Sequence, residues 1–160
     1  MDSRRRWHWT AILACVITAL ALAGAPAAAR CRKVHGRIAL ESASGAACAS
    51  PIGICATGSF RGSVSGVFSF TGTSLTPTVD TPTTSVVLLT GDNLIQTRDG
   101  DLMTKDAVVL RATGTGDFAE VDTIIGGTGA WAGATGSLTA TGTFSAAGGR
   151  GEYAGEVCTP

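Results

Sequence analysis

The chain has 160 residues, 12 basic and 12 acidic side chains, and a formal net charge of zero. A chain of this length is expected to form one domain. Proteins that bind nucleic acid draw most of their affinity from Lys and Arg on phosphates, so the balanced charge and the absence of a basic stripe exclude nucleic acid as the predicted partner.

Residues 1–29 have the pattern of an export signal. Three arginines at positions 4–6 precede an apolar run that is too short for the ~20 residues of a bilayer span and ends in small residues. We therefore predict a signal peptide cleaved near Ala29, a secreted or periplasmic protein with no transmembrane segment, and a single domain at 30–160. The Sec route is favoured over the twin-arginine route, because His8 and Trp9 replace the apolar pair preferred there.

Four cysteines follow the predicted cleavage point: Cys31, Cys48, Cys55 and Cys158. An even number in an exported domain predicts two disulfides, for which three connectivities exist. Cys48 and Cys55 bracket a turn-rich segment, which favours a local Cys48–Cys55 bridge and leaves Cys31–Cys158 to join the two ends of the domain. No Cys-x-x-Cys spacing occurs, so no zinc site is predicted.

Alternation of apolar and polar residues predicts strands through most of the domain. The eight expected strands are 34–41, 59–70, 85–90, 94–97, 102–112, 118–125, 137–145 and 150–158. Segment 71–84 is expected to be a loop because of its prolines, and 91–93, 98–101 and 114–116 are expected to be turns. This pattern favours an all-β, eight-stranded antiparallel barrel, since closure removes exposed edges; a β-sandwich is the runner-up.

Residues 126–136 read Gly-Gly-Thr-Gly-Ala-Trp-Ala-Gly-Ala-Thr-Gly and lead directly into an alternating strand. The glycines are typical of a tight connection, and we expect Trp131 to cover the end of the sheet there. The glycines concerned are Gly126, Gly127, Gly129, Gly133 and Gly136. A dinucleotide-binding fingerprint also fits these letters, but a strand follows where that motif needs a helix.

This glycine pattern resembles the segment that joins two late strands in the allene oxide cyclase barrel family and its dirigent-like relatives, where phenylalanine stands in the place of Trp131. The resemblance implies a small calycin-like barrel with a shaped apolar cavity. It also implies activities that need few reactive groups, such as cyclisation, rearrangement of a fatty-acid epoxide or the steering of radical coupling. No catalytic residue is carried over, because the catalytic glutamate of the cyclases does not align with this chain.

Candidate residues for chemistry are few. His35 lies on the polar face of its strand and is expected to be exposed. Asp92, Asp99, Asp101 and Asp106 raise a calcium interpretation, but they lack the spacing of an EF-hand loop, and aspartate is common in turns. We therefore expect no metal site and no cofactor.

The remaining candidates are Glu120, Asp122 and Tyr153. Glu120 and Asp122 share one face of strand 118–125, and the interpretation we favour directs that face to solvent. The alternative directs it into the lumen, where burial would raise the pKa of both carboxyl groups and enable acid–base chemistry. Tyr153 and Val157 are expected inside, with Glu152 and Glu156 outside, which makes Tyr153 the best polar group in the lumen.

We expect a secreted, disulfide-stabilised barrel that binds a small apolar ligand in its lumen, since an eight-stranded barrel can hold one small molecule. One alternative is a cyclase or isomerase on the same barrel. The other is a structural or interaction module of the cell envelope that has no pocket.

Overall fold

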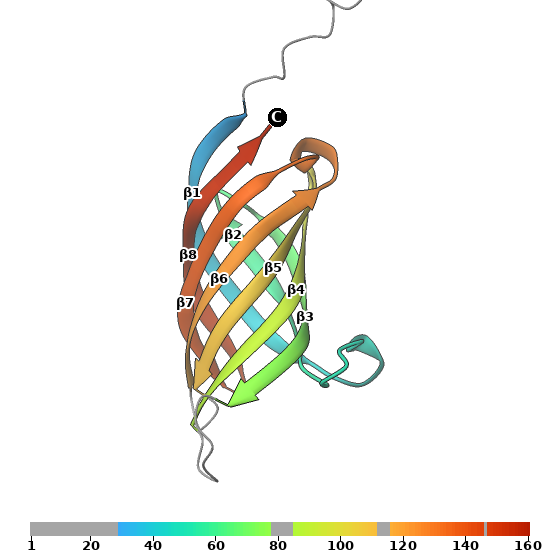
Figure 1. Ribbon diagram of the computed structural model, residues 1–160, viewed down its shortest axis with the longest axis vertical. Helices are drawn as coiled ribbons and strands as arrows, with labels where there is room; N and C mark the ends of the chain where they lie inside the picture. Colours follow the sequence, from blue (N-terminus) through green and yellow to red (C-terminus); the bar gives the residue numbers. More distant parts are fainter. Residues whose placement is uncertain (1–28, 78–84, 112–115, 146) are drawn as a thin grey trace, which may run out of the picture.

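The computed structural model describes residues 29–77, 85–111, 116–145 and 147–160. Eight antiparallel strands form a closed barrel in which each strand pairs with its neighbours in sequence and β1 pairs with β8 (Figure 1). The predicted all-β antiparallel barrel is confirmed, and the alternative prediction of a β-sandwich is wrong. The predicted signal segment, apart from its last residue, lies outside the described residues.

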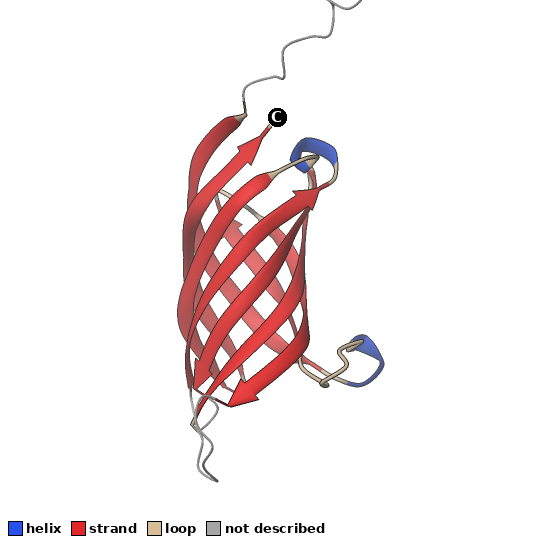
Figure 2. Ribbon diagram, in the orientation of Figure 1, coloured by secondary structure: helices blue, strands red, loops and turns tan. Residues whose placement is uncertain are grey.

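The strands are β1 Arg30–Ala43, β2 Cys55–Gly62, β3 Gly66–Pro77, β4 Val86–Thr97, β5 Gly100–Arg111, β6 Gly116–Gly127, β7 Thr135–Ser145 and β8 Gly148–Thr159. Two short 3₁₀ helices lie at opposite ends of the barrel, η1 Gly45–Ala47 and η2 Gly129–Trp131 (Figure 2). Within the described residues, no helix has the length and apolar character needed to cross a membrane.

The expected strand 59–70 is in fact a hairpin. β2 ends at Gly62 and β3 begins at Gly66, and Ser65 Oγ donates a hydrogen bond to the Gly62 carbonyl across the turn. Phe60, Val64 and Phe68 are all buried inside the barrel. The alternation therefore continues in phase through the turn, which is why the sequence pattern concealed it.

Two other expectations about the strands are wrong. Residues 91–93 are not a turn but the middle of β4, where Asp92 faces out and Asn93 is buried. Residues 71–77 are not a loop, since β3 continues to Pro77 and ends there. The turn expected at 98–101 is confirmed at 98–99, where Thr97 pairs with Gly100 across it, whereas Gly100 and Asp101 already belong to β5. Residues 78–84 and Gly114 lie outside the described residues.

Apolar side chains fill the end of the barrel that carries η2. Ile95, Leu102 and Leu138 are completely buried there, and each such side chain contributes about 1.5 to 3 kcal/mol relative to exposure.

The Tyr153 hydroxyl donates to the Val64 carbonyl and accepts from the Val64 N–H, both at 2.8 Å. Tyr153 thus ties β8 to the β2–β3 turn over the intervening strand β1, where its ring lies against Gly36.

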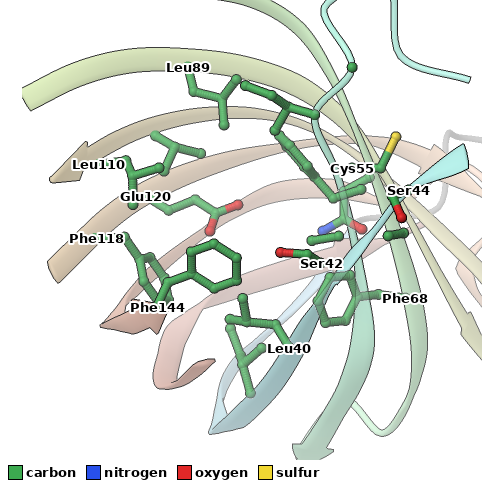
Figure 3. A pocket seen from close by; sticks show the side chains of 18 of the residues that line it. Leu40, Ser42, Ser44, Cys55, Phe68, Leu89, Leu110, Phe118, Glu120 and Phe144 are labelled. Carbon is green, nitrogen blue, oxygen red and sulfur yellow. The ribbon is translucent and has the colours of Figure 1, made fainter. Parts of the chain in front are cut away.

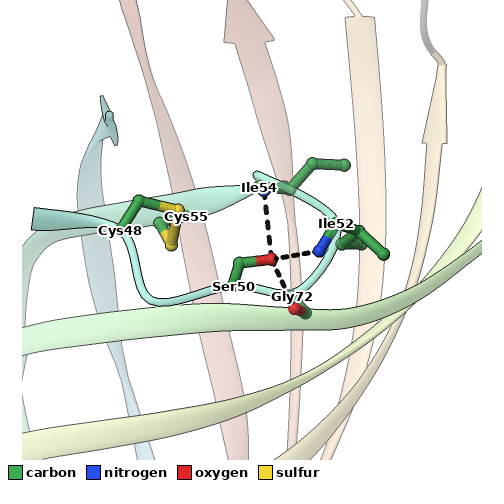
Figure 4. The surroundings of a disulfide bond; sticks show 6 residues. All are labelled: Cys48, Ser50, Ile52, Ile54, Cys55 and Gly72. Carbon is green, nitrogen blue, oxygen red and sulfur yellow. Dashed lines mark hydrogen bonds between the residues drawn. A yellow bond between two sulfur atoms is a disulfide. The ribbon is translucent and has the colours of Figure 1, made fainter. Parts of the chain in front are cut away.

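Both disulfides have the pairing favoured from the sequence. Cys31 bonds to Cys158, its register partner in the β1–β8 ladder, and closes the seam of the barrel. Cys48 bonds to Cys55 and holds the loop that contains η1 (Figure 4). In that loop, Ser50 Oγ accepts hydrogen bonds from two backbone N–H groups and donates to the Gly72 carbonyl. Two disulfides indicate an oxidising, extracytoplasmic environment.

Loss of the seam disulfide should cost more stability than loss of the loop disulfide. Cys158→Ser is expected to lower the free energy of unfolding by about 2 to 4 kcal/mol, because it releases a closure of large sequence separation in the unfolded chain. Cys55→Ser releases a separation of 7 residues and should mainly free the η1 loop. Urea unfolding of both variants measures the difference. Equal losses, or a Cys31–Cys48 link in non-reducing peptide maps, would contradict the assignment.

Candidate functional site

A cavity of about 460 Å³ opens into the end of the barrel that carries η1 (Figure 3). Its wall is mainly apolar and comes from Ile38, Leu40, Ile54, Phe60, Phe68, Phe70, Leu89, Val108, Leu110, Phe118 and Phe144. Polar side chains in the wall are those of Ser42, Ser44, Asn93 and Glu120. This size and this lining are typical of a small-molecule site.

Phenylalanine rings lie against glycines of the barrel wall and leave the centre open. A Cβ atom on Gly91 would lie 2.3 Å from the ring of Phe70, and one on Gly142 would lie 2.7 Å from the ring of Phe118. Only glycine allows a ring to approach the strand backbone this closely. Rings that lie along the wall occupy less of the lumen than rings that point to its axis.

Three carboxyl groups meet inside the barrel, next to the cavity. Asp106 on β5 lies directly opposite Asp122 on β6, and Glu120 lies two residues before Asp122 on the same face. One carboxylate oxygen of each residue lies within 4.8 Å of those of the other two. Asp106 is 3% exposed and Asp122 is 1% exposed. Glu120 is less buried, and its carboxylate points into the cavity (Figure 3).

Few side chains compensate the negative charge of these three carboxyl groups or donate hydrogen bonds to them. The Thr104 hydroxyl donates a hydrogen bond to Asp106 Oδ1. Buried oxygens without a hydrogen-bond partner remain on Asn93, Asp106 and Asp122. All Lys, Arg and His side chains in the described parts of the chain are exposed, so none of them compensates the acids inside the barrel.

Burial raises the pKa of Asp106 to about 8 and the pKa of Asp122 to about 10. Desolvation is the main cause, because a low-dielectric surrounding disfavours the charged carboxylate. The negative charge of Glu120 raises both pKa values further, and Asp106 adds to the effect on Asp122. Burial and the repulsion between the acids therefore favour the protonated form of both aspartates in the cation-free protein.

The favoured interpretation that Glu120 and Asp122 face solvent is wrong. The opposite face of β6 is exposed, with Val121 and Ile125 each 53% exposed. Both faces of this strand carry apolar and polar residues, so the alternation could not decide its orientation. The register does decide it, because Asp122 lies opposite the inward-facing Asp106.

Asp106 belongs to the site, although the sequence suggested a different group for it. Asp92 and Asp99 form ion pairs with Lys105 and Arg98 on the outside, so the four aspartates of the calcium interpretation do not come together. The sequence of β5 did contain a signal that Asp106 points inward. Its neighbours at every second position are mostly apolar: Leu102, Thr104, Val108 and Leu110.

Tyr153 and Val157 lie inside, as predicted, and His35 is exposed. The Tyr153 hydroxyl is already bonded to Val64 on both sides, and Tyr153 is not part of the cavity wall. The structure therefore does not bring Tyr153 together with the carboxyl cluster. Tyr153 stabilises the barrel and is not part of the candidate site.

The glycine-rich connection lies at the other end of the barrel, away from the cavity. Gly126, Gly129, Gly133 and Gly136 have positive φ angles. A Cβ atom on Gly127 would lie 2.7 Å from Cβ of Trp131 and 2.2 Å from the Asp101 carbonyl oxygen. Trp131 is 5% exposed and packs in the core. The glycine-rich connection thus packs the side chain of Trp131 against the end of the barrel.

Comparisons of the chain with protein-family models, with curated proteins and with solved structures found no match. The fold and the site define a class of protein: a closed eight-stranded barrel with two disulfides, an apolar cavity at one end and a buried carboxyl cluster beside it. The resemblance to the allene oxide cyclase barrel family stays a prediction from residues 126–136.

Proposed function

We propose that this barrel binds one small, mainly apolar molecule in the cavity at the η1 end. The observation that carries the proposal is the cavity itself, which is lined by aromatic and aliphatic side chains and holds about 460 Å³. Burial of apolar ligand surface supplies the affinity in sites of this kind, and a few polar groups fix the orientation. Glu120 and Asn93 are the polar groups at the inner part of this wall, so the ligand's polar end would lie there.

Export is part of the same proposal. Residues 1–29 would act as a signal peptide for the Sec route and be cleaved near Ala29. The two disulfides support this view, because such bonds persist in oxidising compartments. The resemblance to the allene oxide cyclase and dirigent-like barrels agrees with a binding cavity, and we propose that relationship on the same footing.

A cavity-filling substitution tests the binding site. Leu110→Trp is expected to weaken binding of the fluorescent apolar probe N-phenyl-1-naphthylamine by roughly tenfold or more, a loss of about 1.4 kcal/mol or more, because the indole takes up ligand space. Val109→Trp is the matched control, since Val109 is the next residue on β5 and is exposed on the outer face. Fluorescence titration gives the affinities, and circular dichroism confirms that both variants are folded.

Absence of saturable probe binding by the wild type would contradict the proposal, as would equal affinities of the two variants. Mass spectrometry of the protein purified from its native host then identifies the natural ligand. A molecule released on denaturation is the expected result.

The second candidate function is an isomerase or cyclase. The specific observation in its favour is the Glu120 carboxylate in the wall of an otherwise apolar cavity, where it could remove a proton from a bound molecule and return it elsewhere. Incubation of the recovered ligand in D₂O separates the two functions. An isomerase should incorporate deuterium into carbon-bound positions of the ligand, and Glu120→Gln should not, whereas a simple binding protein should incorporate none at carbon.

A further inference from the structure

Among the described residues, the donors near the carboxyl cluster are few: the Thr104 hydroxyl, the neighbouring Asn93 amide and the protons that the carboxyl groups themselves carry when no cation is bound. Thr104 occupies Asp106 Oδ1, which leaves Asp106 Oδ2 and Asp122 Oδ1 without partners. Buried carboxyl oxygens are normally paired, because an unpaired one loses its hydration without compensation. Since the described basic side chains are all exposed, the missing positive partner is not supplied by the described residues.

Asn93 gives an independent indication of a ligand at the same place. It lies on β4, is only 6% exposed, and its Oδ1 atom has no hydrogen-bond partner. Its side chain lies beside the Asp106 carboxyl group and in the wall of the cavity, so the unpaired oxygen lies next to the cluster. An amide oxygen carries no net charge, so charge repulsion does not explain why this atom has no hydrogen-bond donor.

We infer that Asp106, Glu120 and Asp122, together with Asn93 Oδ1, form a binding site for a hard divalent cation, with Ca²⁺ as the best fit. The donor set contains only carboxylate and amide oxygens, which hard cations prefer, and no nitrogen or sulfur that would select zinc or copper. Three strands of one rigid sheet hold these donors, and neighbouring pairs are fixed by the ladder registers of β4, β5 and β6.

The spacing of the oxygens agrees with the size of Ca²⁺. Ca²⁺ binds oxygen at about 2.3 to 2.6 Å, so opposite ligands of one ion are about 4.6 to 5.2 Å apart. The three carboxylate oxygens lie within 4.8 Å of one another, so one ion can reach all of them without movement of the strands. Mg²⁺ demands near-ideal octahedral geometry and usually keeps several waters, which suits a largely enclosed set of protein oxygens less well.

Glu120 places this site at the wall of the cavity, whereas both aspartates are enclosed. A bound ion would therefore have its open coordination positions on the cavity side, where water enters. This inference does not rest on binding of an apolar molecule. The sequence prediction of no metal site considered the cysteines and the turn aspartates, and it did not consider these residues as a group.

Calorimetric titration of the EDTA-treated, disulfide-bonded protein with CaCl₂ tests the inference. We expect one ion per barrel, and we expect Asp122→Asn to weaken binding by roughly a hundredfold, because the variant loses a charged ligand. Asp92→Asn is the matched control: Asp92 lies on the outer face of β4, paired with Lys105, and its loss should leave the affinity unchanged.

A second readout avoids dependence on heat alone. Ca²⁺ should raise the melting temperature of the wild type and of Asp92→Asn, and it should not raise that of Asp122→Asn. Absence of saturable Ca²⁺ binding up to about 10 mM would overturn the inference and would mean that protons alone neutralise the acids. Equal affinities of the two variants would also overturn it. Leu110→Trp should keep the cation site, so failure here is distinct from failure of the ligand proposal.

Discussion

Replacement of Trp131 by alanine is expected to lower the free energy of unfolding by about 3 to 5 kcal/mol. The ring is 5% exposed and belongs to the core at the η2 end, in a connection that has little other apolar surface. Its Nε1 atom donates a hydrogen bond of 3.0 Å to Thr97 Oγ1, and the Arg32 guanidinium lies 5.0 Å from the ring centre. The variant therefore loses packing, a hydrogen bond and the attachment of the connection to the β4–β5 turn.

Thermal unfolding measures this loss, which should be roughly 10 to 20 °C in a domain of this size. Trp131→Phe is the control. It keeps most of the apolar area and loses the N–H donor, so its cost should be about 1 to 2 kcal/mol. An alanine variant that melts like the wild type and loses probe binding would instead make Trp131 a ligand contact, against its position at the end opposite the cavity.

Local patterns were enough to predict the barrel. Alternation in segments such as 118–125 and 137–145 gives strands, and the glycine run at 126–136 gives a connection, because both signals depend on neighbours in the sequence. The two disulfides followed from cysteine positions in the same way. Errors occurred where a turn preserved the alternation, as at 63–65, or where turn-like residues lie inside a strand, as at 91–93.

The cavity depends on contacts that no local pattern contains. The ring of Phe70 lies against Gly91, and the ring of Phe118 lies against Gly142 and Gly151, residues that meet only through the strand registers. Alternation along the strands places phenylalanines on the inward face, but it does not say whether the rings fill the lumen or lie along its wall.

The carboxyl cluster was half predictable for the same reason. The sequence placed Glu120 and Asp122 on one face of the same strand. It could not decide whether that face points into the barrel, because both faces carry apolar and polar residues. Asp106 joins them through the β5–β6 ladder, which brings it opposite Asp122. Nothing near Asp106 in the sequence announces this partner, because register is fixed by packing of the whole barrel.

The stability of the protein in EDTA should fall as pH rises from about 5 to 9. Burial raises the pKa of Asp106 to about 8 and that of Asp122 to about 10, from an ordinary value of 3.8. Between the unfolded and folded pKa values the folded state binds more protons, so unfolding releases protons and is favoured by higher pH. One group contributes at most about 1.4 kcal/mol per pH unit, and we expect a total loss on the order of 3 kcal/mol for this mutually interacting cluster.

Asp122→Asn identifies the source of this slope. The groups that face Asp122 are Glu120 on its own strand, Asp106 on β5 and the uncharged Leu138 opposite it on β7. The amide cannot ionise, so the variant should match the wild type near pH 5, lose less stability with rising pH and be the more stable protein at pH 9. Asp92→Asn, which removes an exposed acid, should follow the wild type throughout. Urea unfolding at intervals of one pH unit measures all three proteins, and parallel curves for Asp122→Asn and the wild type would show that Asp122 faces water in solution.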